Sequence, residues 1–130
     1  MKTLFTFACL SIFIACSTSG EQQGERSAST ENTDKPIKEE ILYSSGKVKM
    51  SGQTINGEKH GLWTAYFENG SVWSKNEFDH GIQHGSTMVF QKSGLTYFTG
   101  TYTKGERSGK WKFYDENGEP AKTVDYDKTD

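Results

Sequence analysis

The chain is 130 residues long, and 25% of its residues are charged, 13% are aromatic and 32% are hydrophobic. This length accommodates one small domain. The formal net charge of −2 at pH 7 excludes the strongly basic surface that a nucleic-acid-binding protein needs. Lysines alternate with other residues at Lys47 and Lys49 and at Lys110 and Lys112, which we interpret as solvated faces of strands. We therefore expect no nucleic-acid partner.

Residues 1–15 have the pattern of a secretory signal peptide. Lys2 supplies the positive charge, and the apolar run over residues 4–15 is shorter than the roughly 20 residues of a membrane-spanning helix. The run ends in Phe13-Ile-Ala-Cys16, which resembles a lipobox with Phe where Leu is usual. An ordinary cleaved secretory signal and an uncleaved anchor are the alternatives.

The lipobox resemblance implies that the chain is cut before Cys16 and that the Cys16 thiol carries a lipid. The protein is then a bacterial lipoprotein, anchored to a membrane of the cell envelope. The next residue is Ser17, not the aspartate that retains lipoproteins at the inner membrane in enterobacteria-like sorting, so we expect the outer membrane in a Gram-negative host. Cys9 lies within the signal peptide, and the mature chain is expected to form no disulfide.

Residues 16–40 are predicted to be the lipidated cysteine and a disordered linker. Only Ala28 and Ile37 are apolar after Ser17, and such a segment buries too little surface to offset the entropy of ordering it. A flexible chain of this length has a root-mean-square reach of about 25–30 Å. We expect it to hold the following domain clear of the membrane surface.

Residues 41–126 carry an internal repeat with a period of 24 residues, about 3.5 units in all, followed by a tail over residues 127–130. Glycines keep this spacing in three columns, and aromatic residues follow the same period. The glycine columns are Gly46, Gly70, Gly94 and Gly118; Gly57, Gly81 and Gly105; and Gly61, Gly85 and Gly109. Repeats of this length are typical of arrays in which each unit covers the apolar face of its neighbour.

Each unit is predicted to be a β-hairpin, because segments such as Ser71–Asp79 alternate with period two. Glycine preceded by Ser or Asn recurs between the strands, as in Glu68-Asn-Gly70. This pattern favours a three-residue turn with a left-handed glycine over a two-residue Asn-Gly turn. The choice pairs Tyr66 with Val72. The equivalent pairs are Phe90 with Thr96 and Leu42 with Val48.

The other connections contain glycines four residues apart, as in Gly57–Gly61, and are predicted to be tight loops. The fold class that follows is all-β, an antiparallel meander of about seven strands. Trp63 and Trp111 come just after these loops, and we expect them to cover an end or the second face of the sheet.

The pattern Gly-x-Trp-x-x-Tyr-x-x-Asn-Gly occurs in Gly61–Gly70 and in Gly109–Gly118, and it resembles the MORN repeat variant of bacterial proteins. The resemblance implies an extended antiparallel sheet of stacked hairpins. It also implies a scaffold whose members differ in function. The middle unit departs from the pattern with Thr87 for Trp and Phe90 for Tyr, and the first unit has Leu42 for Tyr, as a capping unit would.

Three histidines, His60, His80 and His84, lie in or beside the predicted Gly–Gly loops. Imidazoles are common ligands for zinc and copper, so these residues are weak candidates for a metal site. The alternative is that they are polar loop residues repeated by duplication, and we expect no metal and no cofactor.

The sequence shows no catalytic arrangement that we recognise. It contains no Gly-x-Ser-x-Gly motif, no phosphate-binding loop and no Cys–His pair, and its acidic residues are scattered over predicted strands and turns. We therefore expect a protein without enzymatic activity.

Trp73 and Tyr97 are the best candidates for a binding surface, because strand alternation places them on the face opposite Val72, Phe78, Phe98 and Tyr102. The sequence thus favours a membrane-anchored module that binds or scaffolds a partner protein at the cell envelope. Two alternatives stay open: an antitoxin-like inhibitor of a toxin partner, since some proteins with this repeat are labelled as antitoxin components, and a module that binds envelope polysaccharide.

Overall fold

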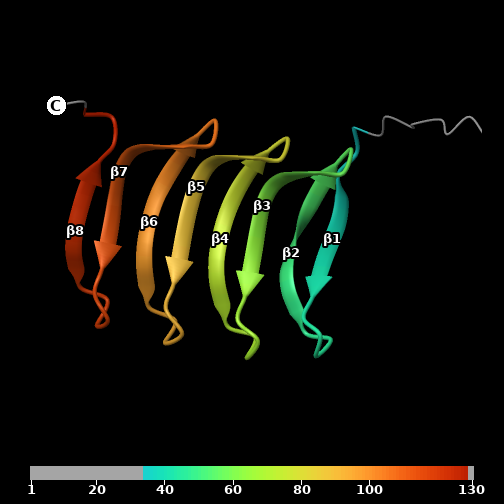
Figure 1. The fold of residues 1–130 in the computed structure, drawn as a ribbon, viewed down its shortest axis with the longest axis horizontal. Helices are drawn as coiled ribbons and strands as arrows, with labels where there is room; N and C mark the ends of the chain where they lie inside the picture. The colour runs from blue at the N-terminus through green and yellow to red at the C-terminus, as the bar shows by residue number, and fades with distance from the viewer. Residues whose placement is uncertain (1–33, 129–130) are drawn as a thin grey trace, which may run out of the picture. The chain divides into compact units, whose positions relative to one another are not determined.

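A computed structural model describes residues 34–128, and these residues form one antiparallel sheet. Eight strands lie side by side in sequence order, and each pairs with the next (Figure 1). They are β1 Ile37–Leu42, β2 Val48–Ile55, β3 Glu58–Tyr66, β4 Val72–Asp79, β5 Ile82–Phe90, β6 Thr96–Thr103, β7 Glu106–Tyr114 and β8 Pro120–Asp125. The predicted all-β meander is confirmed, with eight strands instead of about seven. The signal peptide, Cys16 and the linker up to residue 33 lie outside the described residues.

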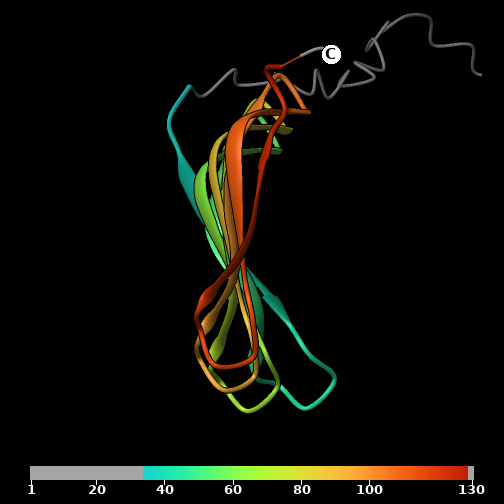
Figure 2. The ribbon, with the colours of Figure 1, turned by 90° about the vertical axis from the view of Figure 1, so that its left-hand side faces the viewer.

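The sheet is a single twisted layer. Figure 2 shows it edge-on, with no second sheet or helix against either face of residues 34–128. Among these residues, no helix has the length and apolarity needed to cross a membrane. A single layer leaves much side-chain surface open to solvent, so the packing that stabilises it comes from side chains of neighbouring strands.

The first strand begins earlier than expected. The predicted linker reached residue 40, but β1 starts at Ile37, which pairs with Thr54 of β2. All residues of β1 are exposed, and its middle carries Lys38, Glu39 and Glu40. An edge strand is held mainly by backbone hydrogen bonds, and its charged side chains prevent the edge from pairing with other chains. Such a strand is therefore as polar as a linker, and its composition alone predicted a linker.

The turns at the lower edge in Figure 1 have the predicted three residues. The amide of Phe67 donates to the carbonyl oxygen of Ser71 at 2.8 Å, and the amide of Gly70 donates to the carbonyl oxygen of Phe67 at 2.8 Å. Gly70 has a φ of +89°, as a left-handed turn position requires. The predicted pairing of Tyr66 with Val72 is confirmed. The pairs Phe90–Thr96 and Leu42–Val48 are confirmed as well.

The turns at the upper edge differ from the prediction. The loop expected over Gly57–Gly61 is a two-residue turn, Asn56-Gly57, with φ values of 53° and 81°. Positive φ at both positions identifies a type I′ turn, whose twist matches that of the flanking strands. The equivalent turns are His80-Gly81 and Lys104-Gly105. Gly61 also has a positive φ, but it lies inside β3.

Gly61 marks a wide bulge in β3. Gln53 pairs with His60 and Ser51 pairs with Thr64, so Gly52 alone lies opposite the three residues 61–63. In Figure 1 the beginnings of β3, β5 and β7 run crosswise along the top of the sheet before each strand turns downward. The extra residues produce this bend, because a bulge lengthens one strand against its partner and raises the local twist.

The bulge positions the tryptophans that form the core of the sheet. Trp63 is the last residue of this bulge and is 1% exposed, and its repeat equivalent Trp111 is 0% exposed. The indole nitrogen of Trp63 donates to the carbonyl oxygen of Gln53 at 2.8 Å. Gly52 lies under the ring, so that a Cβ at this position would overlap the indole. The tryptophans were expected to cover an end or the second face, but they are the centres of the packed units.

The hairpin of β7 and β8 repeats this arrangement with a larger aromatic cluster. The ring of Trp111 lies over Gly100 and meets the ring of Tyr102 at a centroid distance of 5.1 Å and that of Tyr126 at 5.8 Å. The guanidinium of Arg107 is 4.6 Å from the centroid of the Trp111 ring and donates to the hydroxyl of Tyr126. The hydroxyls of Tyr126 and Tyr102 raise the pKa of Arg107, and the guanidinium lies against the aromatic rings as a cation.

The middle unit replaces this pair with a polar one. Thr87 stands where the other units have Trp, and Asn76 stands where they have Gly. The Thr87 hydroxyl donates to the amide oxygen of Asn76 at 2.6 Å, and Thr87 is buried. A hydrogen bond thus replaces aromatic packing at the same place in the repeat, which satisfies both polar groups away from water.

Candidate functional site

Trp73 and Tyr97 are both about half exposed, at 48% and 51%. Each is an extra residue in its strand. Trp73 lies between the pairs Ala65–Ser74 and Tyr66–Val72, and Tyr97 holds the same place in β6. The exposure matches the expectation from the sequence, but the strand alternation on which that expectation rested is interrupted here.

The interruption changes the faces on which these aromatics lie. The ring of Tyr97 contacts the ring of its sequence neighbour Phe98 at a centroid distance of 5.6 Å, and the ring of Trp73 lies 6.1 Å from that of Phe67. Regular alternation would place Tyr97 and Phe98 on opposite faces, whereas a bulge allows two successive side chains to share one. The prediction that Tyr97 lies on the face opposite Phe98 is therefore wrong.

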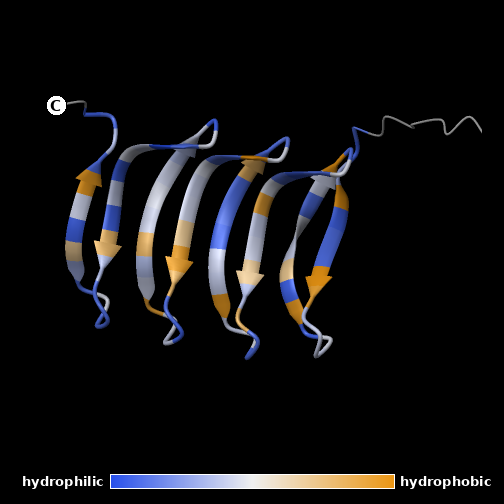
Figure 3. Ribbon diagram, in the orientation of Figure 1, coloured by the Kyte–Doolittle hydropathy of each residue, from blue (hydrophilic) through white to orange (hydrophobic). Residues whose placement is uncertain are grey.

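Other large apolar side chains lie near the same lower edge. Leu42 ends β1 beside the first turn, and Leu95 precedes β6 in the third turn; both are exposed. Figure 3 shows hydrophobic residues at the lower ends of most strands, next to the three-residue turns, and also at the upper ends of β1, β4 and β8. We call Leu42, Trp73, Leu95 and Tyr97 the lower apolar row.

Neighbouring hairpins are tied together at this edge. The hydroxyl of Tyr43 donates to the carbonyl oxygen of Tyr66 at 2.8 Å, and the ammonium of Lys47 donates to the carbonyl oxygen of Glu68 at 3.0 Å. A hollow of about 550 Å³ lies between these two hairpins, lined in part by Val48 and Tyr66. The lower edge is therefore an ordered surface that has both exposed apolar side chains and a hollow between two hairpins.

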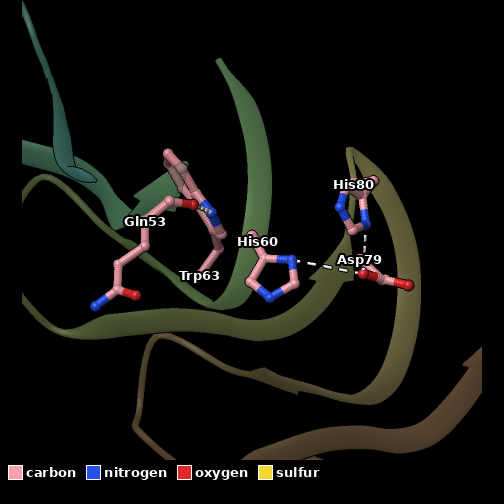
Figure 4. A network of polar contacts seen from close by, with 5 residues as sticks. All are labelled: Gln53, His60, Trp63, Asp79 and His80. Carbon is pink, nitrogen blue, oxygen red and sulfur yellow. Dashed lines mark hydrogen bonds and ion pairs between the residues drawn. The ribbon is translucent and has the colours of Figure 1, made fainter. Parts of the chain in front are cut away.

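The upper edge brings two of the three histidines together. His60 lies in β3, and His80 lies in the β4–β5 turn beside Asp79 (Figure 4). The Asp79 Oδ1 atom is 3.5 Å from the Nδ1 atom of His60 and 2.8 Å from that of His80. The two imidazole rings meet edge to face with a centroid distance of 5.4 Å.

His84 does not join this group. Its Nδ1 atom accepts a hydrogen bond from the backbone amide of Lys104 at 3.3 Å, one turn further along the sheet. Asp79 takes the third place in the cluster, although its surroundings in the sequence did not mark it for this role. Its position was implied by the register, because Gly61 pairs with Phe78 and the next residues outward are His60 and Asp79.

A second carboxylate, that of Glu77, accepts hydrogen bonds within the sheet. Glu77 lies opposite the bulge of β5 and accepts hydrogen bonds from the backbone amide and the hydroxyl of Ser86. These two donors hold the pKa of Glu77 below its ordinary value. Glu77 therefore closes the middle bulge, and its Oε2 atom accepts both hydrogen bonds from Ser86.

The comparison with protein families agrees with this geometry. The model of the MORN repeat variant matches residues 59–80 and residues 107–128. These two segments of the sheet are MORN repeats. The two matched segments are β3 with β4 and β7 with β8, the hairpins that contain Trp63 and Trp111. The intervening hairpin, with Thr87, lies outside the matched segments.

MORN repeat domains are typically protein-binding modules and are generally not catalytic. No curated protein and no solved structure matches this chain. The features of this sheet that can indicate a function are those of its own residues, namely the lower apolar row and the histidine–aspartate cluster on the upper edge.

Proposed function

We propose that this protein is a lipoprotein of the cell envelope whose MORN domain binds or scaffolds a partner protein without catalysing a reaction. The lower apolar row carries the proposal. It presents one Trp, one Tyr and two Leu side chains, each at least 40% exposed, from one edge of an ordered sheet. Large aromatic side chains dominate the energetics of protein interfaces, and exposed apolar groups gathered at one edge are typical of contact sites.

The placement of Trp73 and Tyr97 supports this role. Each lies in a bulge directly after a turn that contains a left-handed glycine, and each contacts a neighbouring ring. An aromatic side chain held in this way loses little conformational entropy when a partner covers it. The two residues occupy the same place in successive units, so a partner that spans two hairpins would contact both.

The N-terminal segment supports the location. The sequence predicts lipidation of Cys16, and the segment between Cys16 and β1 has the composition of a flexible linker. An anchored domain on such a linker would meet partners at the membrane surface. In cells labelled with a fatty-acid analogue, the wild-type protein should carry the label and Cys16→Ser should not. Labelling of the Cys16→Ser variant would contradict the anchor.

The binding surface is tested by the double variant Trp73→Ser, Tyr97→Ser. Cross-linking in intact cells followed by affinity purification should recover a partner with the wild-type protein and lose it with this variant, while the melting temperature stays near that of wild type. The matched control is Leu62→Ser, Ile82→Ser, which removes two apolar side chains of similar exposure away from the lower row.

Two results would contradict the lower row as the contact surface. One is recovery of the same partner by the folded Trp73→Ser, Tyr97→Ser variant. The other is an equal loss of the partner with the Leu62→Ser, Ile82→Ser control, which would indicate dependence on general surface hydrophobicity.

A further inference from the structure

We propose that His60, Asp79 and His80 form a binding site for a divalent transition-metal ion of the zinc class at the β4–β5 turn. One ligand atom from each of these residues lies within 4.8 Å of the other two (Figure 4). The side chains converge from two paired strands and the turn that follows them. This inference is independent of the lower apolar row, which lies at the opposite edge of the sheet.

The distances suit a tetrahedral ion. Zinc–nitrogen and zinc–oxygen bonds of about 2.0–2.2 Å place neighbouring ligand atoms about 3.3 Å apart. The Asp79 Oδ1 atom is 2.8 Å from the Nδ1 atom of His80 and 3.5 Å from that of His60, which brackets this value. Small side-chain rotations are enough to bring all three atoms to one centre, because Asp79 and His80 are exposed.

His60 supplies a second observation. Its Nδ1 atom is buried and has no hydrogen-bond partner, although the Asp79 carboxylate is its nearest charged neighbour. Buried polar atoms in folded proteins are nearly always satisfied, and those that are not call for a physical explanation. A metal ion bound by the lone pair of this nitrogen and by the Asp79 carboxylate would satisfy both groups.

The donor set identifies the class of ion. Two imidazole nitrogens and one carboxylate oxygen suit zinc and its neighbours in the transition series, whereas magnesium and calcium prefer oxygen ligands alone. His80 must give up the Nδ1 proton that it shares with Asp79, and the ring can carry its proton on Nε2 instead. Three protein ligands leave a fourth position for water or for a group from a partner.

The repeat shows that this arrangement is particular to one turn. The next turn has His84 in the place of His60, but Thr103 and Lys104 stand in the places of Asp79 and His80. A threonine hydroxyl is a poor substitute for the carboxylate, and a lysine ammonium repels a cation. The preceding turn has Ile55 and Asn56 in those places. Duplication of the repeat alone therefore does not explain the cluster.

Residues at equivalent positions of other units provide substitutions that the repeat already accommodates. His60→Ser introduces Ser108, the residue 48 positions further along the repeat, and Asp79→Thr introduces Thr103, the residue of the next turn. His80→Asn introduces Asn56, the residue of the β2–β3 turn, which also has a positive φ. His84→Ser is the matched control, because it makes the same change as His60→Ser one unit further along the sheet.

The test is titration of the full chain with zinc chloride by isothermal titration calorimetry, with magnesium chloride as the comparison. We expect one zinc ion per chain, no comparable heat with magnesium, and a rise in melting temperature with zinc. Loss of one ligand should weaken zinc binding by about tenfold or more in His60→Ser, Asp79→Thr and His80→Asn, since even groups behind the ligands matter this much. His84→Ser should bind zinc as the wild type does.

The proposal is overturned if the wild type binds no zinc at micromolar concentration, if it binds magnesium equally tightly, or if His84→Ser weakens zinc binding as much as His60→Ser. Both cysteines are present in every variant, so any thiol contribution is the same throughout. Should His60→Ser fail to fold by circular dichroism, the exposed positions Asp79 and His80 decide the outcome, and unchanged affinity in Asp79→Thr and His80→Asn refutes the site.

Discussion

The close approach of Gly100 and Trp111 predicts that Gly100→Ala lowers the unfolding free energy, the opposite of its usual effect in the absence of a clash. Gly100 lies in β6 directly under the indole, and a Cβ there would overlap the ring of Trp111. Without such an overlap, Gly→Ala at an ordinary strand position would stabilise the protein by about 0.4–1 kcal/mol, because it lowers the entropy of the unfolded chain. Gly100→Ala should instead destabilise it.

The magnitude depends on whether the ring can move away. Trp111 is fully buried, its indole nitrogen donates to the carbonyl oxygen of Thr101 at 3.2 Å, and its ring contacts Phe98 and Tyr102. Overpacking of a well-packed core costs about 1–3 kcal/mol. After the entropic gain, the net loss lies between about 0 and 2.6 kcal/mol. A loss of about 1–2 kcal/mol, in the middle of this range, corresponds to a fall in melting temperature of roughly 5–15 °C for a domain of this size.

The assay is thermal unfolding followed by circular dichroism, supported by urea titration. The double variant Gly100→Ala, Trp111→Phe supplies the control, because the smaller ring leaves room for the added methyl group. The cost of Gly100→Ala should be smaller in the Trp111→Phe background than in the wild type, and the difference measures the coupling of the two positions. A Gly100→Ala protein that melts at or above the wild-type temperature would refute the packing described for the repeat.

Two further predictions concern stability. Gly70→Val should lower the unfolding free energy by about 1–3 kcal/mol, because valine strongly disfavours the positive φ of this turn. The surface change Lys75→Gln should leave the melting curve unchanged. Equal melting temperatures for the two variants would contradict the left-handed turn at Gly70. Glu77→Gln should cost about 1 kcal/mol at neutral pH, because it weakens two charge-assisted hydrogen bonds from Ser86 that are partly exposed to water. The pKa of Glu77 is lowered in the folded protein, so this contribution is complete above the ordinary value of 4.5 and is lost as the pH falls through the lowered one. Urea titrations of Glu77→Gln and wild type should therefore differ at pH 7 and converge in acid, and a constant difference would contradict the role of the carboxylate.

Features set by local chemistry could be predicted from the sequence. The 24-residue spacing of Gly46, Gly70, Gly94 and Gly118 identified the hairpin repeat, because only glycine readily adopts the left-handed conformation that closes a three-residue turn. The turn length in turn determined the pairing of Tyr66 with Val72. These inferences depend on a few neighbouring residues, and they needed no knowledge of how the strands pack.

Features set by pairing across strands were decided only by the tertiary structure. Gly61 appeared to end a loop, but it opens a wide bulge inside β3, and this bulge places Trp63 over Gly52. The extra residue at Tyr97 likewise interrupts the alternation that predicted its face.

Strand pairing also decided which residues form the histidine–aspartate cluster. The sequence by itself determined the repeat, the turn glycines and the grouping of histidines near one edge. The tertiary structure decided that Asp79 and not His84 joins His60 and His80, because which side chains meet depends on the strand register after each bulge. A residue added to one strand shifts every later contact across the sheet, and the period-two pattern of a single strand carries no record of that shift.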